Sequence, residues 1–299
     1  MYMKDNSNID DWFVNLDVCV IQSLDFLATV PLPYPNFFKF NRPLVAGSGN
    51  ALETGRILFQ GQDAIFSDES NYHEEINKAI NGAFLISASG KKDSPDIAGA
   101  IKEKGIEGIL LTCNSKSPAA EYFSQKNVHV YPKTPEPYTY NTSTYLSMIL
   151  SKTKENPKKI KNHLISEVLP LLNIDFSRSQ GYYFLIPKQF HNAQTMMRIK
   201  FEELFGRRIG RDFHTPEFAR NHATDIVLAD NEITISIGYD NKSFGNYKLN
   251  IPLSNEANYG EFMAISYYII GKIQSSNPPY FKNSIVEWCN KRGINPLAD

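Results

Sequence analysis

The sequence predicts an α/β protein of two lobes, each a mostly parallel sheet flanked by helices in three layers. Two observations lead to this fold class. Short apolar runs alternate with segments of helical periodicity, which is the order that builds parallel sheets with helical crossovers. The pattern restarts after a lysine-rich segment at 151–162, and a chain of 299 residues usually divides into two lobes.

The chain is expected to begin with a helix and a connector within residues 1–40. Apolar residues recur at helical spacing from Trp12 to Thr29, and the proline-rich VPLPYPNFF ends that helix. The first lobe, residues 41–155, has five expected strands: PLVAGSG, DAIFSDES, AFLISASG, GIEGILLTCN and NVHVYP. The helices expected around them are ALETGRILFQ, EEINKAI, SPDIAGAIKEKG and NTSTYLSMIL.

The second lobe, residues 156–299, repeats this order of elements. A helix is expected around 164–172, followed by the strand GYYFLIP, the helix TMMRIKFEELFG and the strand RDFHTPEF. Two more strands, EITISIGYDN and NYKLNIPLS, precede a long helix, GEFMAISYYIIGKIQ, and a last helix in NPPYFKNSIVEWCNKRG. The repeat is one of architecture more than of letters.

Charge and composition narrow the partners. Lys and Arg number 31 against 32 Asp and Glu, so the net charge of -1 provides no global field for nucleic acid. No apolar stretch approaches the roughly 20 residues that span a bilayer, and the polar start MYMKDNSNIDDWF lacks a secretory signal. The three cysteines lack CxxC spacing and the six histidines lack HxxxH spacing. We therefore expect a cytoplasmic protein with reduced thiols and no metal, nucleic-acid or membrane partner.

The sharpest local signal is the segment SASGKKDSP at 87–95, which joins a buried strand to a helix. Ser94 is expected to be the N-cap of that helix, with Pro95 in its first turn. The unpaired amides of the helix start, the serine hydroxyls and Lys91 or Lys92 would form a phosphate cradle at the carboxyl edge of the sheet. A polar turn after a strand needs Gly, Ser and Lys in any case, and this alternative stays open.

A strand ending in SxSG, third in its lobe and preceded by a Gly/Ser turn after the first strand, resembles the sugar isomerase (SIS) domain. The likeness extends over roughly residues 40–290 as two domains in tandem, as in archaeal phosphoglucose/phosphomannose isomerases and the isomerase half of glucosamine-6-phosphate synthase. Lysines stand here where the family has Glu/Asn-Thr. The resemblance implies these ligands for a sugar phosphate: Ser48, Ser87, Ser89, Lys92 and Ser94.

Three further first-lobe residues are implied near the sugar. Gly47 and Asn50 flank Ser48 in a loop that would face the same crevice. Glu136 precedes a Ser/Thr-rich helix, as a glutamate often does in the family, and the alternative is a surface-loop carboxylate.

The second lobe carries the residues that the resemblance implies for chemistry. KFEELFG is similar to the family's Lys-x-x-Glu-Leu stretch, whose glutamate is the base, and Glu203 fits better than Glu202. PEFARNHATDIV resembles the family's Glu-x-x-His segment with two extra residues, which implies ring opening by His222, often in the neighbouring subunit's site; His214 is the fallback. PPYFKNSIVE resembles the family tail whose lysine assists at the ring oxygen, here Lys282.

Each of these second-lobe residues also has an ordinary explanation. Adjacent glutamates usually form the solvated face of a helix, a histidine in a strand usually packs or caps, and a lysine on a terminal helix usually lies at the surface. These alternatives stay open at the level of sequence.

The resemblance implies an enzyme, an aldose–ketose isomerase acting on a hexose 6-phosphate or an amino-sugar 6-phosphate. This reaction moves a proton between C1 and C2 through an enediol and needs one well-placed base but no cofactor. A homodimer with sites shared between subunits is implied as well. A fructosamine-phosphate deglycase would use similar residues, and a non-catalytic sugar-phosphate-binding regulatory protein is the remaining alternative.

Overall fold

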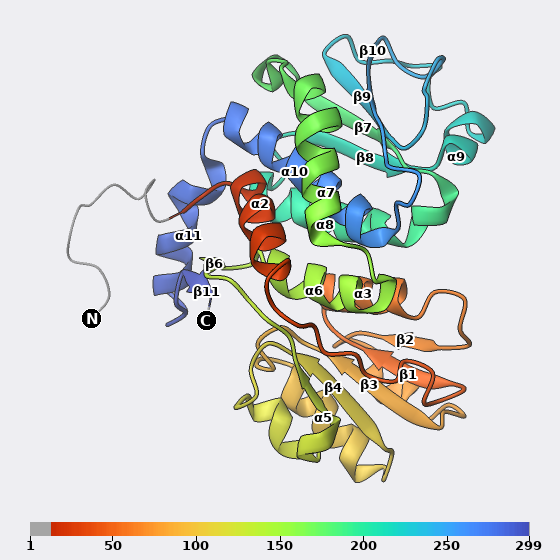
Figure 1. Cartoon of the computed structure of the whole chain (residues 1–299), viewed down its shortest axis with the longest axis vertical. Coiled ribbons are helices and arrows are strands. Elements are labelled where there is room, and N and C mark those ends of the chain that lie inside the picture. Colours follow the sequence, from red (N-terminus) through yellow and green to blue (C-terminus); the bar gives the residue numbers. More distant parts are fainter. Residues whose placement is uncertain (1–12, 299) are drawn as a thin grey trace.

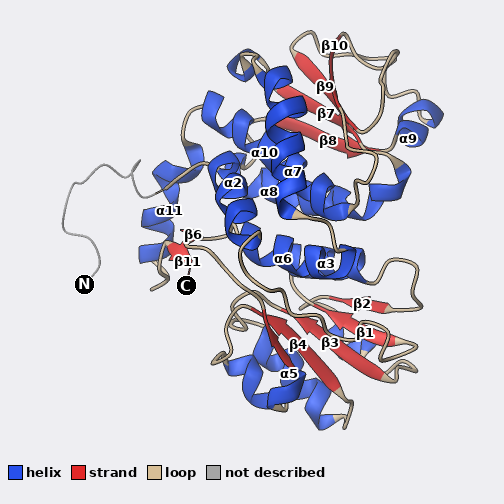
Figure 2. Cartoon of the chain, in the orientation of Figure 1, coloured by secondary structure: helices blue, strands red, loops and turns tan. Residues whose placement is uncertain are grey.

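Two parallel β-sheets lie at opposite ends of the molecule, with helices between them (Figure 1). The computed structural model describes residues 13–298. Helices flank both sheets (Figure 2), so the expected α/β class with parallel sheets is confirmed. Within residues 13–298, no helix is both long enough and apolar enough to cross a membrane.

The first sheet has the strand order β2-β1-β3-β4-β5, and all its strands are parallel. Successive residues of its strands face opposite sides, as Val45 contributes to the large central core and Leu44 to a smaller cluster under α5. The elements are β1 (Pro43–Ala46), α3 (Asn50–Leu58), β2 (Ile65–Ser67), α4 (Tyr72–Glu75), β3 (Gly82–Ile86), α5 (Ser94–Glu103), β4 (Gly108–Thr112), η1 (Pro118–Tyr122), η2 (Gln125–Asn127), β5 (Val128–Val130) and α6 (Thr142–Thr153).

The second sheet has the order β10-β9-β7-β8 and is also fully parallel. Helices α8 and α10 separate it from the first lobe (Figure 1). The elements are α7 (Pro157–His163), η3 (Leu164–Val168), η4 (Leu169–Leu172), η5 (Phe176–Arg178), β7 (Gly181–Leu185), η6 (Lys188–Ala193), α8 (Gln194–Phe205), β8 (Gly210–His214), α9 (Pro216–Asn221), β9 (Glu232–Ile237), β10 (Tyr247–Ile251), α10 (Tyr259–Ser276) and α11 (Tyr280–Asn290).

The strand orders agree with the repeat of architecture. In each sheet the first strand, β1 or β7, pairs with the second strand on one side and the third on the other. The carboxyl ends of these strands therefore form a topological switch point, where ligands bind in open α/β sheets. The serine-rich loop follows β3, whereas the corresponding residues 238–246 lead to β10 without a helix.

Several expected elements are shorter or differently bounded. The expected helix EEINKAI reduces to α4, and the helix that opens the chain, α2 (Leu16–Leu27), begins after Trp12, which lies outside the described residues. The strand expected over RDFHTPEF ends at His214, because the hydroxyl of Thr215 accepts a hydrogen bond from the Phe218 amide and begins α9.

One pairing was not predicted. Strand β6 (Glu136–Pro137) runs antiparallel to β11 (Leu297–Ala298). The Tyr138 amide extends it by donating to the carbonyl of Pro296 at 2.8 Å. The tail of the described chain is thereby fixed against the segment that leads into α6.

One hydrophobic core runs through both lobes. Val45 of the first sheet and Ile235 of the second belong to the same buried cluster, and helices α2, α6 and α10 contact one another at its centre. The lysine-rich segment between the lobes is only partly a linker, since α6 extends to Thr153 and α7 begins at Pro157. Between them, Glu155 accepts hydrogen bonds from the amides of Gly260 and Glu261 at the start of α10.

Candidate functional site

The serine-rich loop is compact and internally bonded. The Ser87 hydroxyl accepts hydrogen bonds from the Gly90 amide at 3.1 Å and from the Ser94 hydroxyl at 2.6 Å. Gly90 has a φ of +62°, and a Cβ there would overlap the side chain of Ser117, so this position requires glycine. The loop therefore has one defined shape in which two serine hydroxyls lie together beside α5.

The N-cap of α5 is not Ser94, as expected, but Asp93. Ser94 is the first helical residue, and its hydroxyl is directed to Ser87 instead of to the helix amides. The Asp93 side chain makes no capping hydrogen bond. The Ser94 amide donates to the Lys91 carbonyl at 3.3 Å and Pro95 has no N–H. The Asp96 amide is therefore the donor that the first turn of α5 can offer to an anion.

The loop after β1 lies next to the end of β3. A Cβ on Gly47 would come within 3.0 Å of the Ile86 carbonyl oxygen, so glycine permits this close approach. Ser48 is exposed, and the buried Asn50 begins α3 with neither side-chain polar atom paired within residues 13–298. A buried amide without partners is costly, which makes Asn50 available for a polar ligand.

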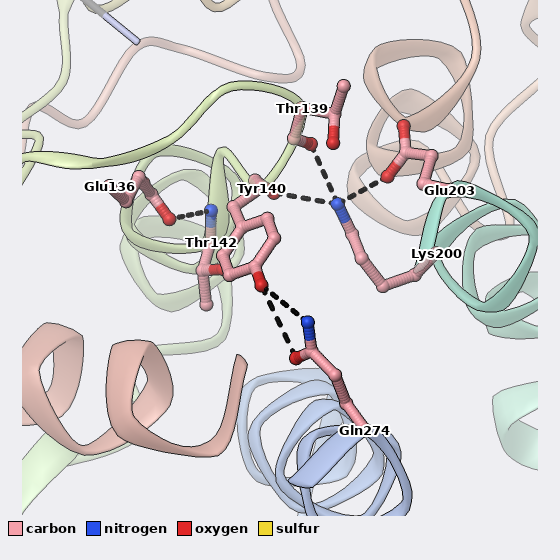
Figure 3. Close-up of polar contacts among 7 residues, drawn as sticks. All are labelled: Glu136, Thr139, Tyr140, Thr142, Lys200, Glu203 and Gln274. Carbon is pink, nitrogen blue, oxygen red and sulfur yellow. Dashed lines mark hydrogen bonds and ion pairs between the residues drawn. The ribbon is translucent and has the colours of Figure 1, made fainter. Parts of the chain in front are cut away.

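Helix α8 presents a buried ion pair toward the first lobe (Figure 3). Lys200 is 0% exposed, and its ammonium donates to the carbonyls of Thr139 at 2.7 Å and Tyr140 at 2.9 Å. It also pairs with the Glu203 carboxylate at 2.6 Å. Three acceptors around one ammonium satisfy the buried charge and fix the carboxylate in place.

Glu203 is largely buried, but part of its side chain remains accessible to a ligand. Its side chain is 26% exposed, so a ligand can reach it. Burial raises the pKa of Glu203, and the positive charges of Lys200 and Lys92 oppose that rise without cancelling it. A carboxylate with a raised pKa is a stronger base than an ordinary surface glutamate.

Glu136 is only 2% exposed, so the surface-loop alternative for it is wrong. Its carboxylate accepts hydrogen bonds from the Thr142 amide and the Ser143 hydroxyl, both at 2.8 Å (Figure 3 shows the first). Glu136 therefore caps the start of α6. It fixes the turn that carries the Thr139 and Tyr140 carbonyls.

The serine-rich loop is linked to Glu203 through Lys92, whose charge acts on the Glu203 carboxyl. The Lys92 ammonium lies 5.2 Å from the ring centroid of Tyr138, the residue before the carbonyls that bind Lys200. Two surface hollows have volumes of about 480 and 410 Å³. The first lies along α5 between its start at Pro95 and Asp96 and the rings of Tyr72 and Tyr122, and the second lies at the carboxyl edge of the second sheet.

No histidine within residues 13–298 has a recorded contact with Glu203. His214 is the last residue of β8 and His222 follows α9, and each ring lies against Phe218. Glu203 lies near the end of α8, which runs back toward the amino ends of the strands, as crossover helices do. Figure 1 shows α9 at the outer edge of the second lobe. Within one chain, the expected base and the expected ring-opening histidine thus lie at opposite edges of a sheet.

Lys282 lies in the first turn of α11, a helix that packs on α8. The charge of Lys282 acts on the carboxyl group of Asp17. Burial raises the pKa of Asp17, while the positive charges of Lys272 and Lys282 lower it.

Lys200 was missed by the sequence reasoning. A lysine three residues before a glutamate on a helix is usually a surface pair, and this one is buried because α8 packs against the Thr139–Tyr140 turn.

Comparisons with known proteins identify the fold. No family model and no curated protein sequence matches this chain. Among solved structures, glucosamine-6-phosphate deaminase from Thermotoga maritima is similar with a TM-score of 0.61 and 14% identity, over 94% of this chain and 96% of that one. Tagatose-6-phosphate ketose/aldose isomerase from Escherichia coli has a TM-score of 0.60 and 15% identity, over 89% and 92%.

The C-terminal domain of glucosamine-fructose-6-phosphate aminotransferase from Francisella tularensis is similar over 97% of this chain and 99% of that one, with a TM-score of 0.61 and 10% identity. At these identities the likeness shows the fold alone. The likeness supports the SIS-type α/β fold expected from the sequence.

Proposed function

We propose that this chain is a sugar-phosphate isomerase that interconverts an aldose and a ketose, acting on a hexose 6-phosphate or an amino-sugar 6-phosphate. The observation that carries the proposal is a partly exposed glutamate, which a buried lysine holds in place and on which the charge of Lys92 in a compact serine-rich loop acts. The names of the similar structures, all of which concern sugar 6-phosphates, support the same substrate class.

The phosphate would bind at a helix start that no side chain already caps. Glu136 occupies the start of α6, and Glu155 occupies the start of α10. Helices α3 and α5 have no side-chain capping bond, and both begin at the carboxyl edge of the first sheet. A phosphate is therefore best accommodated between them, with these hydroxyls as ligands: Ser48, Ser87, Ser89 and Ser94.

Glu203 would act as the base that moves the proton between C1 and C2. Its carboxylate is accessible and its pKa is raised, which suits proton abstraction near neutral pH. Lys282 would assist at the ring oxygen and His222 would open the ring.

We also propose the division into two tandem three-layer domains, residues 41–155 and 156–299, after a connector of residues 1–40. The equal strand orders β2-β1-β3 and β8-β7-β9 support the duplication. A close relation to the archaeal isomerases remains part of this proposal.

The proposed protein is a homodimer in which His222 completes the partner's site. The loop after His222 exposes apolar side chains, with Ile226 80% and Val227 86% accessible. Apolar side chains so exposed are typical of an interface. Light scattering should give twice the chain mass, and Val227→Lys should shift the protein toward monomer. A wild-type protein that stays monomeric at all concentrations would contradict the dimer.

The phosphate cradle is tested by thermal unfolding with hexose 6-phosphates and with the free sugars. A ligand at 100 times its Kd stabilises the folded state by about 2.7 kcal/mol, so Tm should rise with the phosphorylated sugars only. Ser89→Ala should lose most of that rise, because it removes a hydroxyl from the loop. Ser124→Ala, an exposed serine of the same lobe, is the matched control. No Tm rise with any phosphorylated sugar in the wild type would reject the substrate class.

A non-catalytic sugar-phosphate-binding protein is favoured by one observation, the distance in the fold between Glu203 and the histidines within a chain. NMR of hexose 6-phosphates incubated with the protein distinguishes the candidates. Conversion of aldose to ketose supports the isomerase, release of the amine from a fructosamine 6-phosphate indicates a deglycase, and binding without either supports the regulatory protein.

A further inference from the structure

Lys92 has an unusual backbone conformation. Its φ is +55°, in the left-handed region that residues other than glycine rarely adopt. The residue lies at the end of the serine-rich loop, two positions before α5 begins.

The ammonium of Lys92 points toward the segment that leads into α6. It lies over the ring of Tyr138, which in turn lies 5.7 Å from the ring of Trp288 on α11. The serine hydroxyls meanwhile bond to one another, Ser94 to Ser87. The Lys92 ammonium and the serine pair thus have different partners.

Tyr138 directly precedes the two residues whose carbonyls bind the lysine that pairs with the proposed base. The next two carbonyls, of Thr139 and Tyr140, accept hydrogen bonds from Lys200, which pairs with Glu203. The charge of Lys92 also reaches Glu203, since it is one of the positive charges that oppose the rise in the pKa of that carboxyl. The ring contact and the charge effect therefore link Lys92 to the glutamate end of the site.

We propose that Lys92 is a catalytic residue whose ammonium stabilises the enediolate oxygen, and not a ligand of the phosphate as its place in the sequence suggests. This inference rests on the proposed isomerase function. A positive charge held where negative charge develops in the reaction lowers the barrier, because it interacts more strongly with the transition state than with the substrate.

The step conserves atoms and electrons. The Glu203 carboxylate takes the proton from C2 of the open-chain aldose, the electron pair of that C–H bond forms the C1=C2 double bond, and O1 of the former carbonyl takes the negative charge. Lys92 is placed to neutralise that oxygen. Transfer of the O2 proton to O1 and return of the Glu203 proton to C1 then give the ketose.

Binding of two unreactive ligands distinguishes stabilisation of the enediolate by Lys92 from binding of the phosphate by Lys92. A hexitol 6-phosphate carries the phosphate but no carbonyl, whereas an aldonohydroxamate 5-phosphate carries the phosphate and a planar anionic end that imitates the enediolate. Calorimetric titration of Lys92→Met should show the hydroxamate weakened by about 100-fold and the hexitol by less than threefold. Lys92→Arg should recover part of the hydroxamate affinity, since it keeps the charge.

Lys126→Met is the matched control, because it removes an equal charge from the same lobe at the amino edge of its sheet, just before β5. It should leave both affinities within threefold of the wild type. If turnover is measurable, Lys92→Met should lower kcat and leave KM nearly unchanged.

Equal weakening of both ligands in Lys92→Met would overturn the proposal and return Lys92 to the phosphate. Unchanged affinity for both would remove it from the site. Either result would leave the isomerase proposal intact, because wild-type binding is measured in the same series. A wild-type protein that binds neither ligand would reject the sugar-phosphate site and the role of Lys92 together.

Discussion

Replacing Glu203 by glutamine should lower isomerase turnover by about 10²–10⁴-fold, the usual contribution of a general base. Glutamine keeps the size of the side chain and one hydrogen-bond acceptor for Lys200, but it cannot take a proton from carbon. Affinity for a hexitol 6-phosphate should therefore stay within a few-fold of the wild type. Turnover and calorimetric binding on the same preparations measure both quantities.

Glu202→Gln provides the control on the adjacent residue. Glu202 is half-exposed and pairs with Arg211 at 2.6 Å, on the opposite side of the helix from the Lys200 contact with the first lobe. Its loss should change turnover less than twofold. Equal losses in the two variants, or full turnover in Glu203→Gln, would exclude Glu203 as the base.

The second large effect is expected for Lys200→Met, which should destabilise the protein by about 2–3 kcal/mol and move the acid limb of kcat/KM to higher pH. The buried ammonium satisfies two backbone carbonyls and one carboxylate, and its removal leaves them without a donor. The partial exposure of Glu203 keeps the stability loss below that of a fully buried pair.

The sign of the pH shift follows from the charges. Burial raises the pKa of Glu203 and the Lys200 charge lowers it, so loss of Lys200 raises the pKa further. The base is active only when deprotonated, and activity is lost as pH falls through its pKa. The variant should therefore lose activity at a higher pH than the wild type. Chemical unfolding and the pH profile measure the two effects.

Lys161→Met serves as the comparison, because Lys161 pairs with Asp25 at 2.6 Å near the surface. A surface pair of this kind contributes less than about 1 kcal/mol. A Lys200→Met profile that coincides with the wild-type profile would show that Lys200 does not influence the base.

The alternation of apolar runs and helical segments was sufficient to predict both parallel sheets. Strands such as PLVA and GAFLI are buried throughout, and this leaves a continuous apolar run that periodicity detects. The ends of the helices and strands were harder to predict than their existence. The strand expected over RDFHTPEF included the start of α9, because a Thr-Pro pair can continue a strand or begin a helix and only the packing decides.

The site was predictable only in part, because sequence gives residue types and not their surroundings. The serine loop is marked by its composition, and Glu203 by its resemblance. The burial of Lys200 depends on a turn some 60 residues earlier in the chain, and the capping role of Glu136 depends on the fold of the following helix. The pairing of β6 with β11 joins segments that no local pattern connects.

The single hydrophobic core that runs from one sheet to the other has a consequence for assembly. A chain with one lobe would expose the inner faces of α2, α6 and α10 to water, and it could cover them only by associating with another copy. Such an association weakens on dilution, as mass action requires. Joining the lobes in one polypeptide keeps this core, and the contact of Lys200 with the first lobe, intact at any protein concentration.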